Sequence, residues 1–109
     1  MFEFLARLGS RNWPVTQGEV TEAEVEEVQS GNPSELRLAI AYKFSIGADG
    51  PYTGEGFWQP QWSHRALEKL EAAERFLHPG HPVQVRYKPD DPSVNELHEL
   101  DKLIEGAAL

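Results

Sequence analysis

Hydrophobic and polar residues alternate most strictly in the middle of the chain. Apolar or aromatic side chains occupy every second position of residues 36–46, with polar or small residues between them. This period of two predicts a half-buried strand. Before it, residues 15–28 carry valines among glutamates, and residues 30–33 read Ser-Gly-Asn-Pro, a turn sequence. The two segments together predict a long antiparallel hairpin.

A helix is the alternative for residues 21–29. Thr21 and Glu24 fit a capping box, in which the two side chains bond to the free backbone N–H groups of a first helical turn. Ala and Glu are also good helix formers. The hairpin is our preferred interpretation, and the sequence leaves the helix open.

Glycine and proline residues mark the later boundaries. Residues 47–51 turn the chain into a second strand pattern, residues 52–58, where Gly54 and Gly56 suggest a bulge or a close backbone approach. Ser63 is a candidate N-cap for a helix that continues to about Leu77 and ends at Pro79.

The C-terminal third begins with another alternating segment. Val83, Val85 and Tyr87 predict a strand, and the prolines of residues 89–92 end it because proline lacks a backbone donor. Apolar residues then recur at helical spacing from Leu97, which predicts a short terminal helix.

These elements predict an α+β fold, with an antiparallel sheet of four or five strands that can curl toward a barrel. One helix, about residues 63–77, packs on the sheet, and a short helix follows at the C-terminus. We divide the chain into an N-terminal arm (residues 1–12), one small β-rich domain (13–97) and a tail, expected to be helical (98–109). The side chains expected to share one core are Leu38, Ile40, Tyr42, Phe44, Val83, Val85, Tyr87, Leu67, Leu70 and Leu77.

Composition limits the classes of function. The chain has 109 residues, and its 10 Lys plus Arg against 18 Asp plus Glu give a net charge of −8, which argues against a nucleic-acid partner. The absence of Cys excludes disulfides, thiolate metal sites and cysteine nucleophiles. No run approaches the roughly 20 apolar residues of a membrane span, and no secretory signal pattern opens the sequence. We therefore expect a cytoplasmic protein.

Several short motifs together point to a family. They are Trp13-Pro-Val-Thr-Gln-Gly-Glu-Val20, Tyr42-Lys-Phe44, Tyr52-Thr-Gly54, Pro79-Gly80, Val83-Gln-Val-Arg-Tyr-Lys-Pro-Asp-Asp-Pro92 and Asn95-Glu-Leu97. Over residues 13–97 the chain resembles the bacterial family named only as domain of unknown function 3592. The resemblance implies a small β-rich domain with one helix, usually carried beside transmembrane helices in envelope proteins. It implies no catalytic residues, and no residue role follows from it.

Aromatic residues form the main candidate binding site. Tyr52, Trp58 and Trp62 lie close in sequence, and such side chains combine a large contact area with a polar tip. The competing interpretation is that they fill the core between helix and sheet.

Other polar groups give weaker candidates. His78 and His81 flank a Pro-Gly turn, but no third metal ligand follows at a telling spacing. Asp90 and Asp91 suit a turn better than acid-base catalysis. No catalytic motif is present, and we predict no catalytic residue, metal or cofactor.

The preferred function is a non-catalytic interaction module that presents a sheet edge or the aromatic segment to a protein or peptide partner. The first alternative is a small-molecule binding domain with a ligand between helix and sheet, lined by the same aromatic residues. A hydrolase is the less favoured alternative, since it requires a carboxylate or His with a displaced pKa in a cleft.

Overall fold

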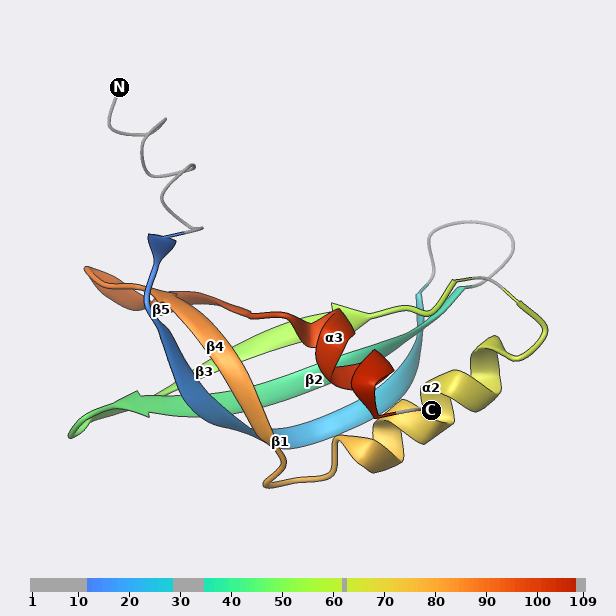
Figure 1. Cartoon of the computed structure of the whole chain (residues 1–109). Coiled ribbons are helices and arrows are strands. Elements are labelled where there is room, and N and C mark those ends of the chain that lie inside the picture. Colours follow the sequence, from blue (N-terminus) through green and yellow to red (C-terminus); the bar gives the residue numbers. More distant parts are fainter. Residues whose placement is uncertain (1–11, 29–34, 62, 108–109) are drawn as a thin grey trace.

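Five strands and two helices make up the described part of the chain. The structure, a computed structural model, describes residues 12–28, 35–61 and 63–107. The elements follow in the order β1 (Val15–Val28), β2 (Glu35–Ile46), β3 (Asp49–Trp58), α2 (Ala66–Phe76), β4 (Pro82–Lys88), β5 (Asp91–Leu97) and α3 (Leu100–Gly106) (Figure 1). The predicted α+β class is confirmed, including the C-terminal helix.

The long hairpin is formed by β1 and β2, so the helical alternative for residues 21–29 is wrong over the described residues. The register runs from Gly18 beside Phe44 to Val28 beside Glu35 and shifts once, between Val20 and Glu22. This bulge changes which residues face inward, because an extra residue reverses the alternation of a strand. Pairing along the whole of β2 outweighs the local helix preference of the Glu-rich segment.

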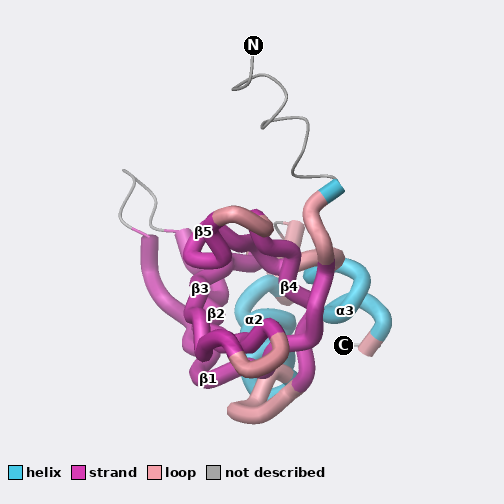
Figure 2. The backbone as a smooth tube through the Cα atoms, turned by 90° about the vertical axis from the view of Figure 1, so that its left-hand side faces the viewer, coloured by secondary structure: helices cyan, strands magenta, loops and turns pink. Residues whose placement is uncertain are grey.

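The sheet is antiparallel throughout and curls until its two edge strands meet. The strand order is β3-β2-β1-β4-β5, so β3 and β5 are the edges. Figure 2 looks along the curled sheet and shows the strands as a ring, with α2 visible through it. The result is a nearly closed barrel, which the sequence pattern had left as an option.

The closure depends on the two glycines of β3. A Cβ atom at Gly54 would overlap the Asn95 carboxamide and the phenol of Tyr42, and one at Gly56 would lie 2.6 Å from Leu97 Cδ1. The side chains of β5 therefore occupy the space that β3 leaves free. The sequence suggested either a bulge or a close backbone approach at these glycines. The structure shows a close approach at both.

β5 itself was not predicted. The turn after β4 is confirmed, but the chain becomes extended again at Asp91, and Val85 lies beside Leu97 across the new hairpin. Pro92 is acceptable there because an edge strand has one side without ladder bonds.

The core lies inside the ring and under α2. Its buried members are Val20, Leu38, Ile40, Tyr42, Phe44, Trp58, Leu70, Ala73, Leu77, Val83, Val85 and Ile104, with Tyr87 packed against them. One predicted core residue is wrong: Leu67 is 49% exposed, because the buried side of α2 begins one turn later, at Leu70. The helix also starts at Ala66, three residues after the predicted cap Ser63.

Candidate functional site

The structure separates the aromatic residues predicted to bind a partner. Trp58 is a core residue with 9% of its surface exposed, whereas Tyr52 is half-buried. The two side chains lie six positions apart on β3, a distance of roughly 20 Å along a strand. Trp62 lies outside the described residues. Tyr52 and Trp58 therefore do not form one surface, and the binding role of the three residues stays a prediction.

Tyr52 and Trp58 have different surroundings. The Tyr52 hydroxyl donates a hydrogen bond to Asp49, and this bond, aided by desolvation and by the charges of Asp49 and Asp91, raises the pKa of Tyr52. Trp58 borders a hollow of about 270 Å³ between the end of β3 and the two helices, lined also by Pro60 and Ile104. Tyr52 does not line this hollow, so the pocket expected for the small-molecule alternative is not assembled as predicted.

The two histidines of the Pro-Gly turn do lie together. Their rings meet edge to face, with centroids 5.4 Å apart, and the His81 ring also packs on Phe76. Burial, with a smaller contribution from His78, lowers the pKa of His81. Within residues 12–28, 35–61 and 63–107, no three His, Cys, Asp or Glu side chains gather closely enough to hold a metal ion.

The most distinctive region is the line where β3 and β5 face each other, which we name the seam. One side chain bridges it: Asn95 Nδ2 donates to the Thr53 carbonyl at 3.2 Å, and Asn95 Oδ1 accepts a hydrogen bond from the Tyr42 hydroxyl at 2.5 Å. Burial and the charge of Glu96 raise the pKa of Tyr42 to about 12, which keeps its hydroxyl protonated as a donor. The residues that the structure describes show no backbone pairing between β3 and β5.

The Thr53 carbonyl reveals how the edge of β3 is oriented. It points away from β2 and toward the seam, because a β5 side chain reaches it. Backbone groups alternate sides along a strand in an antiparallel sheet, and the pairing of β3 with β2 is regular from Tyr52 to Trp58. Glu55 and Phe57 therefore also direct their N–H and C=O groups toward the seam, where no described residue forms a ladder with them.

A groove runs along this edge, and we name it the seam groove. Its volume is about 520 Å³, within the range of ordinary ligand pockets. The lining residues are Glu55, Gly56, Phe57, Asn95, Glu96, Leu97, Glu99, Leu100, Asp101 and Lys102, contributed by β3, β5 and the start of α3. Phe57 is 45% exposed, with the Arg37 guanidinium 3.7 Å from its ring centroid.

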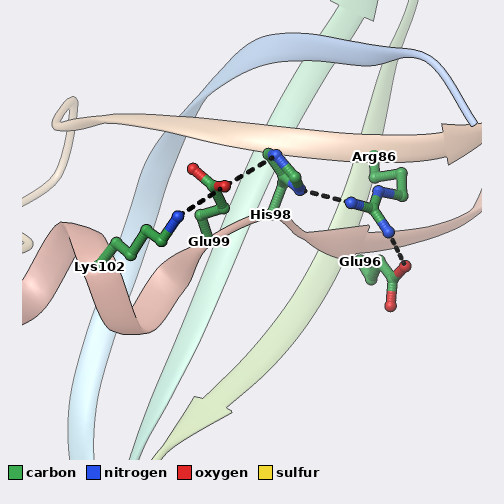
Figure 3. Close-up of polar contacts among 5 residues, drawn as sticks. All are labelled: Arg86, Glu96, His98, Glu99 and Lys102. Carbon is green, nitrogen blue, oxygen red and sulfur yellow. Dashed lines mark hydrogen bonds and ion pairs between the residues drawn. The ribbon is translucent and has the colours of Figure 1, made fainter. Parts of the chain in front are cut away.

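A chain of polar contacts holds the far wall of the groove (Figure 3). Arg86 Nη2 lies 2.8 Å from His98 Nδ1, and Lys102 Nζ lies 3.2 Å from Glu99 Oε1. An arginine can only donate, so Nδ1 of His98 accepts, and the proton of the neutral imidazole belongs on Nε2, which faces Glu99 at 3.8 Å. These contacts attach α3 to β4 and β5.

The backbone at the start of α3 is unusual. Glu99 has a φ of 53°, in the left-handed region that glycine tolerates best. This conformation turns the chain from β5 into the helix, and the Glu99 carbonyl then accepts a hydrogen bond from the Leu103 N–H at 3.1 Å. The groove wall is thus formed by a sharp corner rather than by a continued strand.

Comparison with known proteins identifies the family. A family model described as domain of unknown function (DUF3592) matches residues 16–100. The chain belongs to this family. The resemblance predicted over residues 13–97 is thereby confirmed, while no curated protein and no solved structure matches the chain. The DUF3592 description assigns no activity, so function must be argued from geometry.

The family resemblance implied a domain that is usually carried beside transmembrane helices. In the described ranges, no helix combines the length and the apolar character needed to cross a bilayer.

The seam groove itself was missed by the sequence analysis. Glu55 and Phe57 alternate with Gly54 and Gly56. The side chains of the first pair are exposed on the outer face of β3, whereas the two glycines face the inner side. The glycines gave the available signal, because a close approach there requires another segment to lie beside β3. The identity of that segment, β5, depended on a strand that the sequence did not predict.

Proposed function

We propose that this DUF3592 domain is a non-catalytic interaction module that binds an extended segment of a protein or peptide partner along the open edge of β3. The observation that carries the proposal is the orientation of the Glu55 and Phe57 backbone groups toward the seam groove. Adding a strand to such an edge is a common mode of peptide recognition, in which main-chain hydrogen bonds supply affinity.

The dimensions of the groove fit a short strand. Thr53 to Phe57 spans about 13 Å of extended chain, which corresponds to a partner segment of about five residues. The groove is open on the outside, because the outer side chains of β3, including Phe57, are exposed. A partner strand can approach from this outer side, where it meets the Asn95 and Leu97 side chains of β5 that reach Thr53 and Gly56.

The chemistry of the groove favours binding over catalysis. Displaced pKa values mark many catalytic groups. Among the described residues, the side chains with clearly displaced pKa values, Tyr42, Tyr52 and His81, lie outside the groove lining. The cytoplasmic location expected from the sequence remains part of this proposal.

Hydrogen exchange in the whole chain tests the proposal. The probes are three heptapeptides, Thr-Xaa-Thr-Val-Thr-Xaa-Thr, in which Xaa is Lys, Ser or Glu, so that each Xaa lies two positions from an apolar residue on the same face of the strand. With a bound peptide, the exchange of the Glu55 and Phe57 amide protons should slow, because these groups become hydrogen-bonded. No slowing at either amide with any of the three peptides would show the proposal to be wrong.

Backbone methylation of the peptide provides the matched control. Alternate amides of an added strand face β3, and the others face away. A peptide N-methylated on the first set should lose binding, whereas one with the same number of methyl groups on the second set should retain it. Equal binding by both methylated peptides would contradict strand addition.

A further inference from the structure

The walls of the seam groove carry an excess of carboxylates. Glu55, Glu96, Glu99 and Asp101 line it together with a single base, Lys102. Lys102 is already 3.2 Å from Glu99, and Arg86 is 3.7 Å from Glu96. Glu55 and Asp101 form no ion pair with any residue that the structure describes. The groove therefore presents negative charge that its own neighbours do not balance.

The same sign of charge continues onto the outer face of the sheet. Glu55 also borders a smaller hollow over Ala39 and Ala41 of β2, whose other wall includes Glu22 and Glu24 of β1. The β1 glutamates and Glu55 of β3 thus flank a strip of small residues. Clustered charges of one sign raise the local concentration of ligands of the opposite sign and speed their association.

Arg37, which packs on Phe57, does not offset this field. Arg37 Nε lies 2.6 Å from Glu26 Oε1, so its charge is matched by that carboxylate. Its guanidinium also covers one side of the Phe57 ring. Phe57 thereby remains an apolar contact surface beside an acidic one.

From this arrangement we infer, on the basis of the proposed function, that the partner segment is cationic, with a Lys or Arg two positions from an apolar residue. Directly opposed residues on neighbouring strands are in side-chain contact. A strand added to β3 would place one outward side chain opposite Glu55 and the next outward side chain opposite Phe57. The first position favours a base and the second an apolar side chain.

The three heptapeptides also test this inference, with affinity as the readout. The Lys peptide should bind most tightly, the Ser peptide less tightly and the Glu peptide least. Raising the salt concentration from about 50 to about 200 mM should weaken the Lys peptide and leave the Ser peptide nearly unchanged, because salt screens exposed charges.

Variants of the groove carboxylates test whether the preference for the Lys peptide arises in the seam groove. Glu55→Gln and Asp101→Asn should each weaken the Lys peptide about two- to fivefold, as expected for exposed ion pairs, without changing the Ser peptide. Glu71→Gln is the matched control, since Glu71 is exposed on α2 and does not line the groove. Glu55→Lys should reverse the preference and bind the Glu peptide better than the unaltered domain does.

The outcomes separate this inference from the proposed function. If the Ser peptide binds as tightly as the Lys peptide while the Glu55 and Phe57 amides are protected, the cationic partner is wrong and strand addition stands. If Glu71→Gln weakens the Lys peptide as much as Glu55→Gln does, the attraction is only that of the overall charge, and the inference is also wrong. If no peptide protects the two amides, both ideas are wrong.

Discussion

The second half of β1 and the outer side of β3 both lack a neighbouring strand in their ladders, and the fold treats these two edges in opposite ways. β4 pairs with β1 from Val15 to Glu19, and Val20 still exchanges backbone hydrogen bonds with Gly80 and His81. Beyond that point α2 covers the edge of β1, where Glu74 Oε2 accepts a hydrogen bond from the Val25 N–H at 2.8 Å. At the edge of β3, side chains of β5 pack beside Gly54 and Gly56, but no described residue forms a ladder with the backbone of Glu55 and Phe57.

The difference shows which edge is structural and which is available. Unpaired strand edges invite pairing with other chains, so folded proteins usually cover them. Here the covered edge borders α2, which contributes Leu70, Ala73 and the adjoining Leu77 to the core. The open edge borders a groove lined by exposed side chains and a short corner. This contrast supports the assignment of the β3 edge to partner binding.

The largest expected loss of stability comes from loosening α2, the helix that covers the edge of β1. Leu70 is 1% exposed, so Leu70→Ala should lower the free energy of unfolding by about 2–5 kcal/mol through a cavity under α2. Urea unfolding measures it, and Leu67→Ala, on the exposed first turn, should change stability by less than about 0.5 kcal/mol. Similar costs for the two variants would show that α2 is not seated as described.

A smaller effect is expected where the seam closes. Gly54→Ala should destabilise the domain by about 1–3 kcal/mol, because its methyl group meets the Tyr42 ring and Asn95 in a packed interior. Gly56→Ala should cost less, because it meets only the end of the Leu97 side chain, which can rotate. Denaturant midpoints of the two variants test the order, and the reverse order would contradict the packing of β5 on β3.

The cover of β1 also depends on one hydrogen bond. Glu74→Ala leaves the Val25 N–H without its acceptor and should cost about 1–2 kcal/mol, since the bond involves a charged group but is partly exposed. The Val25 amide proton should also exchange faster. Glu71→Ala on the same helix is the control and should leave that proton unchanged. Unaltered exchange in Glu74→Ala would mean that α2 covers the edge without this bond.

A pH dependence, confined to alkaline solution, is expected at the bridge across the seam. The pKa of Tyr42 is about 12 in the folded chain, above the ordinary value of 10.0, so the unfolded chain loses this proton first as the pH rises. Stability should therefore fall between about pH 10 and pH 12. Tyr42→Phe should show a weaker decline than the unaltered chain in urea midpoints measured across this range. Equal declines would exclude Tyr42 as the cause.

How far the sequence predicts this fold depends on whether a strand's pattern is regular. β2 was predicted because its pairing with β1 along residues 35–41 has no bulge, and alternate side chains from Leu38 to Phe44 enter the core. β1 was ambiguous because its bulge, between Val20 and Glu22, interrupts the period of two. β5 was missed because it is an edge strand with a proline and few apolar residues, so its signal is weak.

The candidate site was less predictable than the fold. The seam groove exists because the sheet curls until strands from distant parts of the sequence face each other, which no local pattern encodes. Trp58 illustrates the same limit, since its position between the glycines of a strand and the following helix fitted either a surface or the core. Leu67 has the helical spacing of a core residue but lies one turn before the contact with the sheet begins.

The carboxylates beside the open edge also bear on how copies of this chain meet one another. Two molecules that joined through their β3 edges, antiparallel and centred on Glu55, would set each Glu55 against its counterpart. Like charges directly opposed on neighbouring strands destabilise the pair. Acidic side chains can thus leave an edge accessible to a basic segment while discouraging its growth into a continuous sheet of identical chains.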